Sequence, residues 1–155
     1  MSPIPKFATL VGFAALLAVG CSPVENRLVN AARNDDVETL RRLAAKPSVD
    51  LNRQEEGMLG ETPLTAAVLC PATNAFIFLL NSGANIDARN RGGETPLMVA
   101  CVLGDQGWQK VSLLVKAGAD VNAKDTNGFS VLQHAQGAGA TQIVQFLIKS
   151  GAKTN

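Results

Sequence analysis

The feature that most constrains this chain is an internal repeat with a period of 33 to 35 residues. One phrase occurs as TPLTAA at residues 62–67, as TPLMVA at 95–100 and, more weakly, as SVLQHA at 130–135. A second phrase keeps the same period, with SGANIDA at 82–88, AGADVNA at 117–123 and SGA at 150–152. Units of this length cannot bury their own apolar faces, so they must stack on their neighbours, and at least three are needed.

Each unit is predicted to contain two short helices. Thr62 and Thr95 precede prolines, which is typical of an N-cap followed by Pro at the first helical position. Leu64 and Ala67 are three residues apart and therefore share one face of the first helix. The second helix is expected to bury Phe76, Leu79 and Leu80 in one unit, Val111, Leu114 and Val115 in the next, and Ile143, Val144, Leu147 and Ile148 in the last. Glycines 83, 118 and 151 then fit the left-handed residue that ends such helices.

These phrases and their spacing resemble the ankyrin repeat, whose period is 33 residues and whose phrase is TPLHxA. The resemblance covers about residues 26–155 and implies an all-α fold, a short solenoid of helix-turn-helix units joined by hairpin-like loops. About four units are expected, at 26–56, 57–89, 90–124 and 125–155, of which the first and last are degenerate caps. The chain departs from the phrase at its fourth position, which holds Thr65, Met98 and Gln133 instead of His.

The N-terminus has a different character from the repeats. Residues 7–20 form an apolar run of 14 residues after Lys6, too short for the roughly 20 residues of helix that a bilayer requires. Its length and flanks favour a secretory signal peptide over residues 1–20, although a buried core helix is the alternative. Residues 17–20 (LAVG) followed by Cys21 resemble the lipobox of bacterial lipoproteins, which implies lipid on Cys21 and a short tether at 21–25. The other interpretation is a plain signal peptide in which Cys21 is incidental.

The composition excludes several kinds of binding and catalytic site. The chain has 14 Lys and Arg against 13 Asp and Glu, so it lacks the basic excess on which nucleic-acid binding depends. With one His in the chain, catalysis that needs two histidines is excluded, and no zinc cluster of N and S ligands is expected. No motif indicates a cofactor or a small-molecule substrate. Cys70 and Cys101 are expected to remain separate, with Cys101 as a small buried core residue.

Two insertions interrupt the repeat. The first hairpin, around residues 54–60, is two residues longer than its equivalents, and the third unit gains two residues within 104–109, beside the single tryptophan, Trp108. Insertions in repeat arrays map to loops, often on a binding face. For Trp108, packing over a helix end and binding to a partner both remain open.

The candidate binding residues are those that the stack does not demand. They lie at the hairpin tips, in the position before each helix-opening Thr or Ser, in the position before the packed Ala, and in the insertion. The set is Met58, Leu59, Glu61, Arg91, Glu94, Val99, Trp108, Thr126, Asn127, Phe129 and His134.

Function is therefore predicted from what the fold leaves exposed. An ankyrin-like stack implies a non-enzymatic module that binds, scaffolds or inhibits another protein. Together with the lipobox, it predicts a lipid-anchored periplasmic module, placed at the outer membrane on the assumption of a double-membraned bacterium. One form would be an immunity protein against an envelope-targeted toxin. The alternatives are a structural envelope component and, less favoured, a hydrolytic enzyme.

Overall fold

The structure, a computed structural model, describes residues 24–71 and 73–154. The described residues form eight α-helices and one 3₁₀ helix, and extended pairing among them is limited to one isolated bridge between Lys124 and Ser130. The helices are α1 (Val24–Arg33), α2 (Val37–Ala44), α3 (Pro63–Leu69), α4 (Asn74–Asn81), α5 (Pro96–Val102), η1 (Gly104–Gly107), α6 (Trp108–Lys116), α7 (Val131–Gly137) and α8 (Thr141–Lys149). The all-α prediction is confirmed, and α1 begins two residues before the expected start of the repeat domain.

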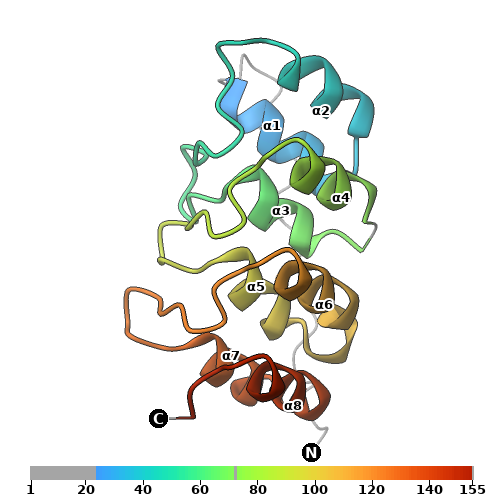
Figure 1. Ribbon diagram of the computed structural model, residues 1–155. Coiled ribbons are helices and arrows are strands. Elements are labelled where there is room, and N and C mark those ends of the chain that lie inside the picture. The colour runs from blue at the N-terminus through green and yellow to red at the C-terminus, as the bar shows by residue number, and fades with distance from the viewer. Residues whose placement is uncertain (1–23, 72, 155) are drawn as a thin grey trace, which may run out of the picture.

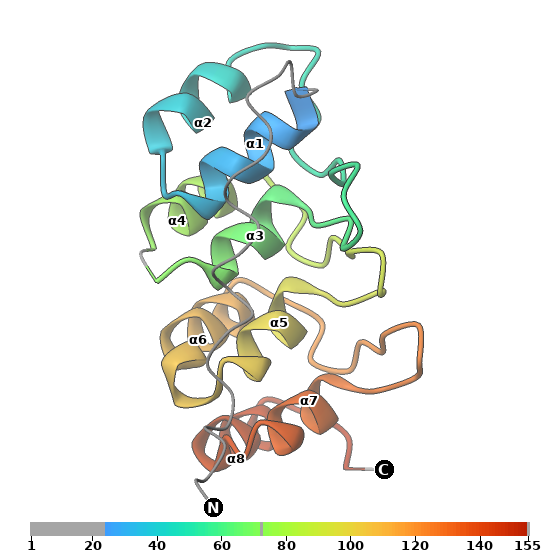
Figure 2. The same cartoon turned by 180° about the vertical axis from the view of Figure 1, so that it is seen from behind.

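The helices are arranged as four antiparallel pairs stacked one on another (Figure 1). The first helices of the pairs, α1, α3, α5 and α7, form one layer and contact one another in sequence. The second helices, α2, α4, α6 and α8, form the other layer, as the reverse view also shows (Figure 2). The hairpin loops between the pairs all project from the same side of the stack. The predicted solenoid is therefore confirmed.

The N-caps explain why the first helices begin where they do. The hydroxyls of Thr62, Thr95 and Ser130 each accept a hydrogen bond from the backbone N–H three residues later. The fourth position of the phrase completes each capping box, because Thr65 Oγ1 and Gln133 Oε1 accept the N–H of the N-cap residue at 2.8 Å. Met98 Sδ lies 3.5 Å from the Thr95 nitrogen. Polar or polarisable side chains at the fourth position of the phrase thus cap the N-termini of these helices, although none of them is a histidine.

The core runs as a continuous aliphatic strip between the two layers. Buried side chains of the first helices, such as Leu64, Leu97 and Val131, meet those of the second helices, such as Phe76 and Leu114. Alanines 67, 100 and 135 are fully buried, which allows the helices to approach closely. The expected core is confirmed with one correction at the C-terminal end of the stack. Ile148 is exposed, because no further unit follows to cover that side of α8 in the described chain.

The insertion in the third unit forms η1, a single tight turn between α5 and α6. Its last residue, Gly107, lies so close to α5 that a Cβ atom there would be 2.0 Å from the carbonyl oxygen of Ala100. A glycine is therefore required where η1 crosses the end of α5.

Two polar side chains complete helix ends in neighbouring units. Asp35, in the left-handed region with φ of 55°, accepts the Ala75 N–H at 2.6 Å and the Asn74 side chain at 2.7 Å. It thereby caps the start of α4, whose own N-cap residue makes no side-chain bond. Lys110 of α6 is buried, and its Nζ donates to the carbonyl oxygen of Val68 at 2.7 Å and to that of Cys70 at the end of α3. Charged groups thus satisfy orphan backbone groups across the unit boundaries.

Candidate protein-binding surface

The hairpin tips are joined into a row by backbone hydrogen bonds. Arg91 N donates to Leu59 O and Thr126 N donates to Gly92 O, both at 3.1 Å. Below the tips, a side-chain oxygen of one loop accepts a backbone N–H of the next loop. Asn52 Oδ1 accepts from Asn85, Asp87 Oδ1 accepts from Asp120, and Asn122 Oδ1 accepts from Lys153. Successive loops are therefore fixed relative to one another, and side chains on them are presented from a rigid support.

Arg91 is exposed but takes part in this row. Its Nη1 donates to Gly57 O at 2.6 Å and to Met58 O at 3.2 Å, so the guanidinium holds the first tip against the second. The prediction that the stack makes no use of Arg91 is therefore wrong. Its exposed position on the tips is as expected.

Glu61 was expected on the binding surface, but its side chain is buried. The residue is 4% exposed, and Arg33 Nη2 of the first unit lies 2.6 Å from its Oε2 and 3.3 Å from Glu55 Oε1. Burial lowers the pKa of Arg33, but hydrogen bonds and charges of Glu61 and Glu55 outweigh it and raise that pKa. Glu61 links the first two units and is removed from the candidate surface.

Two further candidates have structural roles. Glu94 is half-buried and closes its own hairpin, because its Oε2 accepts Asn90 Nδ2 at 2.7 Å while its N–H donates to Asn90 Oδ1 at 2.9 Å. Val99 is buried in the core together with its equivalent Ala66. The expectation that the position before the packed Ala is exposed is therefore wrong for α3 and α5, where the neighbouring units cover it.

The last hairpin and α7 together form a compact polar and aromatic cluster. His134 Nε2 lies 3.1 Å from Asp125 Oδ2, and the Phe129 ring meets the His134 ring edge-on at 6.4 Å between centroids. Asp125 Oδ1 also accepts the N–H groups of Asn127 and Phe129. Desolvation raises the pKa of Asp125, but these hydrogen bonds and the His134 contact prevail and lower it. The cluster fixes Phe129, which is 52% exposed, at the surface.

Trp108 is the first residue of α6, whereas the hairpin loop follows the last residue of that helix. Trp108 therefore lies away from the row of tips. Its ring contacts the Phe146 ring of α8 edge-on, with centroids 5.2 Å apart, and the side chain is half-buried. Of the two interpretations left open, packing over a helix end accounts for this position.

His134 is half-buried on α7, so six of the predicted residues remain together on the tips after these corrections. The tip surface, as defined here, consists of Met58, Leu59, Arg91, Thr126, Asn127 and Phe129. Met58 is 91% exposed and Leu59 62% exposed, so three large apolar side chains, with Phe129, face solvent on a row held by hydrogen bonds. Such a combination of rigid support, apolar groups and an arginine is suited to binding another protein.

The described part of the chain offers little to reaction chemistry. No group of three His, Cys, Asp or Glu side chains there could hold a metal ion. Cys70 and Cys101 are buried as separate thiols, and burial raises the pKa of Cys101 to about 12. None of the described helices is long and apolar enough to cross a membrane. Residues 1–20 and Cys21 lie outside the described residues, so the signal peptide and lipobox remain predictions.

Lys110 and Asp35 were missed by the sequence reasoning. For Lys110 a signal existed, because it precedes Val111 and lies four residues before Leu114 on the buried side of α6. For Asp35 the sequence holds no comparable signal, since its partners in α4 lie 39 and 40 residues away.

Comparison with known proteins agrees with this architecture. The chain matches the family described as ankyrin repeats (3 copies) over residues 28–125 and 93–155. It is 37% identical over 129 residues to neurogenic locus notch homolog protein 1 of Cricetulus griseus and of Xenopus laevis, matches that cover 83% of this chain. It is 36% identical over 123 residues, 79% of this chain, to neurogenic locus notch homolog protein 2 of Homo sapiens. The chain spans about 5% of the length of each of these relatives. The match to the family covers the helix pairs, the capped helix starts and the linked hairpins described above. This chain therefore belongs to the ankyrin repeat family.

Proposed function

We propose that this chain is a lipid-anchored module of the bacterial cell envelope that binds a partner protein through its tip surface. Ankyrin repeats are protein-interaction modules, which supports the binding function. The single observation that carries the choice of surface is the exposure of Met58, Leu59 and Phe129 on loops held together by hydrogen bonds. Apolar side chains on a pre-organised support bind a partner without a large ordering cost.

The anchor is supported by the sequence before the repeats. A signal peptide over residues 1–20 would be removed before Cys21, whose thiol would carry the lipid, and the residues between Cys21 and the start of α1 at Val24 would separate the bilayer from the stack. Attachment of two or more acyl chains gives stable anchoring, since each buried methylene contributes about 0.8 kcal/mol. Ser22 after the cysteine supports sorting to the outer membrane, with the module facing the periplasm.

Within this function, the role is to hold or inhibit the partner. An immunity protein that blocks a toxin delivered to the envelope is one form, and a scaffold for an envelope enzyme is another. A structural envelope component is the alternative class. A hydrolytic enzyme is less favoured, because the His134 ring on α7 bonds to Asp125 of the preceding hairpin and no described serine or cysteine side chain bonds to it.

The binding surface is tested by replacing Leu59 and Phe129 together with Ala. We expect affinity for the partner to fall at least tenfold, about 1.4 kcal/mol, because two apolar contacts are lost. Melting should stay nearly unchanged, since each surface change alters stability by about 0.5 kcal/mol or less. Partners are captured from envelope membranes with the unaltered chain, identified, and titrated against both proteins.

Val102→Ala is the matched control for this experiment. Val102 is as exposed as Phe129 but lies at the far end of α5, away from the tips. Its replacement should leave affinity unchanged. If the folded double variant binds as tightly as the unaltered chain, the partner does not use the tip surface.

The anchor is tested by Cys21→Ser. We expect the variant to lose incorporation of labelled palmitate and to leave the membrane fraction, because no other thiol stands at the lipobox. Cys70→Ser is the control and should still be labelled and still pellet with membranes. Labelled, membrane-bound Cys21→Ser protein would show that the lipid is elsewhere or that the segment anchors the chain in another way.

A further inference from the structure

The last hairpin contains the single Asn-Gly pair of the sequence, Asn127-Gly128. An asparagine in this setting deamidates without an enzyme, because the backbone nitrogen of the next residue attacks the side-chain carbonyl carbon and a glycine has no Cβ to obstruct the approach. Both residues are exposed at the tip of the hairpin, and Asn127 belongs to the tip surface. The pair therefore places a reactive side chain on that surface.

The turn requires Gly128 but not Asn127. Gly128 has a φ of 84°, and its N–H closes the turn by donating to Asp125 O at 3.1 Å. The equivalent pair in the second hairpin is Gly92-Gly93, in which Gly93 has a φ of 75°. A left-handed glycine is thus common to both hairpins, whereas the position of Asn127 also accepts a residue with no side chain.

The side-chain amide of Asn127 is unengaged, unlike those of the other asparagines in the hairpin segments 50–61, 85–94 and 120–130. Each of the others bonds through its side chain to a backbone or side-chain group nearby. They are Asn52, Asn85, Asn90 and Asn122. Asn127 contributes its backbone N–H, which donates to Asp125 Oδ1 at 2.8 Å, and its side chain forms no hydrogen bond with the described residues. No such bond therefore opposes rotation of its side chain toward the next nitrogen.

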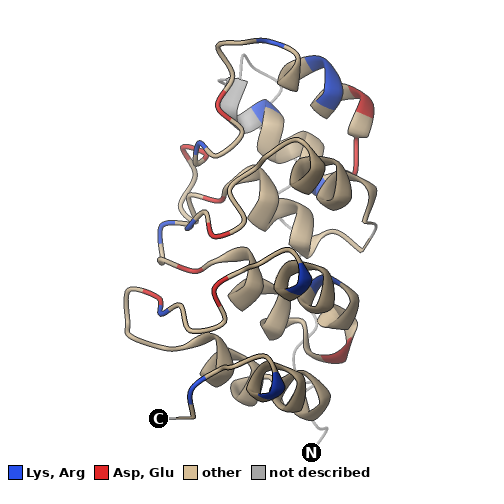
Figure 3. Ribbon diagram, in the orientation of Figure 1, with Lys and Arg blue, Asp and Glu red and all other residues tan. Residues whose placement is uncertain are grey.

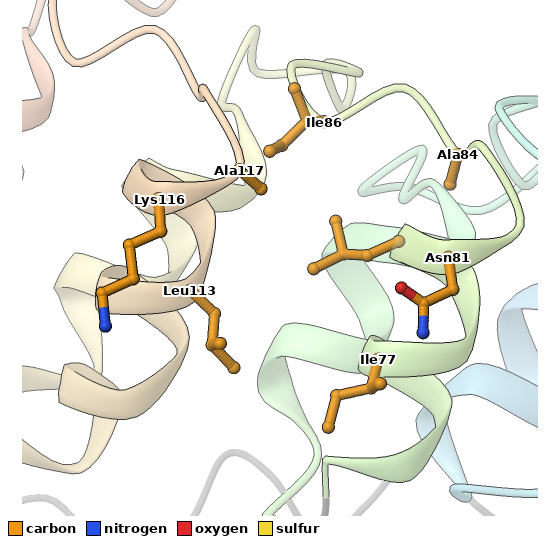
Figure 4. Close-up of a pocket in the computed structure, with 8 residues that line it drawn as sticks. Ile77, Asn81, Ala84, Ile86, Leu113, Lys116 and Ala117 are labelled. Carbon is orange, nitrogen blue, oxygen red and sulfur yellow. The ribbon is translucent and has the colours of Figure 1, made fainter.

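Asn81 shows that exposure alone does not give this reactivity. It is exposed at the end of α4, where it lines the groove between α4 and α6 (Figure 4). The next residue, Ser82, carries a side chain, and its N–H donates to Phe78 O at 2.9 Å and to Leu79 O at 3.2 Å. The nitrogen that would attack Asn81 is thus held by the helix, whereas Gly128 N makes one bond at a loop tip. Loop tips open at a lower free energy than helices packed on the core.

We propose that Asn127 deamidates in the folded protein and that the product rearranges the tip surface. When the turn opens and Gly128 N loses its proton, this nitrogen bonds to Asn127 Cγ and the side-chain nitrogen leaves as ammonia. Water then opens the cyclic imide at either of its carbonyl carbons. Opening at Cγ gives aspartate, and opening at the backbone carbon gives isoaspartate, in which the main chain runs through Cβ and Cγ. The net change is the gain of water and the loss of ammonia, so the reaction needs no oxidant and no cofactor.

Isoaspartate lengthens the backbone at the point where the turn fixes Phe129. Phe129 N donates to Asp125 Oδ1 and Phe129 O accepts Asp125 N, both at 3.0 Å, and the Phe129 ring meets His134 edge-on. An extra methylene between residues 127 and 128 requires these contacts to shift. Either product also adds a carboxylate to hairpins that already hold most of the Asp and Glu residues (Figure 3). Weaker partner binding by the modified tips rests on the proposed function, whereas the deamidation itself does not.

The modification is tested by ageing the purified full chain in mildly alkaline buffer and mapping its tryptic peptides, with an unaged sample as the blank. Asn127 is the sole asparagine of the peptide 125–149. We expect this peptide to show the mass shift of an amide converted to an acid, to separate into aspartate and isoaspartate forms, and to be labelled by an isoaspartyl methyltransferase. The converted fraction should increase with hydroxide concentration, because the attacking nitrogen must lose its proton. Asn122, which is exposed and followed by Ala123 in the peptide 117–124, should remain unchanged.

Two variants relate the reaction to the turn. Asn127→Gly copies the second hairpin and should give no conversion in this peptide. Asp125→Ala removes the acceptor of the Asn127 and Phe129 N–H groups, so the turn opens more often and conversion should be faster. Conversion of Asn127 no faster than that of Asn122 in the unaltered chain overturns the proposal. So does conversion that occurs only in urea, because the folded turn then protects the residue.

The rearrangement is tested by amide hydrogen exchange over residues 125–132. Asn127→Asp is the matched control, because it adds the same charge without lengthening the backbone. We expect faster exchange in aged chain enriched in isoaspartate than in Asn127→Asp, since the Phe129 N–H is displaced from its acceptor. Equal exchange would overturn the rearrangement. A rearranged tip that binds the partner as tightly as before would instead count against the proposed binding surface and leave the inference about Asn127 in place.

Discussion

Replacement of Gly107 by Ala is expected to destabilise the protein by about 3 kcal/mol or more, because the new methyl group overlaps backbone. A Cβ at this position would lie 2.0 Å from Ala100 O, 3.0 Å from Ala100 C and 3.3 Å from Leu103 Cβ. A side chain could rotate away from such a contact, but the carbonyl of α5 is held within its helix. Either η1 or the end of α5 must therefore move. Thermal and urea unfolding of the variant measure the loss, which corresponds to a melting temperature lower by roughly 10 °C.

Gly137→Ala is the matched control, because it makes the same chemical change where space is free. Gly137 is the last residue of α7, and, apart from its chain neighbours and the backbone of its own helix, no atom lies within 4 Å of the position that its Cβ would take. Alanine has the higher helix propensity, so this variant should be as stable as the parent or more stable by up to about 1 kcal/mol. Equal stability of the Gly107 and Gly137 variants would mean that η1 does not cross α5 as described.

Replacement of Lys110 by Ala is the second large effect, with an expected loss of about 2–4 kcal/mol. The ammonium group donates to the carbonyl oxygens of Val68 and Cys70, and the Lys110 side chain that reaches from α6 to the end of α3 is buried. Its loss leaves both carbonyls without that donor at a buried helix end. Burial lowers the pKa of Lys110, which reflects the cost of holding a cation there. Urea unfolding at neutral pH measures the effect.

Lys116→Ala serves as the control for Lys110. Lys116 is on the same helix but exposed, so its replacement should change stability by about 0.5 kcal/mol or less. Lys110→Met separates the two contributions, because it keeps most of the side-chain volume and removes the donor. The stability that Lys110→Met loses should be intermediate between the losses of Lys110→Ala and Lys116→Ala. If Lys110→Ala proves as harmless as Lys116→Ala, the ammonium group does not hold the end of α3.

The fold could be predicted from the sequence because its determinants are local and repeated. The Thr-Pro helix starts, the helix-ending glycines such as Gly83 and Gly118, and the spacing of the apolar residues each specify a few neighbouring residues. A fixed period then places these short segments in a stack. Ile148 was misplaced because the equivalent Leu80 and Val115 of the inner units are partly buried against the core, whereas Ile148 in the terminal unit is exposed.

The site was harder to predict because exposure depends on residues far along the chain. Glu61 and Glu94 precede equivalent helix starts, yet Arg33 buries the former while the latter remains half-buried. Val99 and His134 also occupy equivalent positions, and one is in the core while the other bonds to Asp125. The tips were predicted more successfully, since a hairpin turn projects from the stack whatever its neighbours are. Met58, Leu59 and Phe129 are accordingly exposed as expected.

The bonds across unit boundaries set an order in which a growing chain can complete its structure. Asp35, which caps the start of α4, is synthesised before that helix, so this end can close as soon as α4 emerges. Lys110, which closes the end of α3, follows Val68 by 42 residues. A nascent chain that has emerged only as far as its second unit therefore still has α3 open at its carbonyl end. The middle of the protein is therefore expected to become resistant to proteases only after the third unit has left the ribosome.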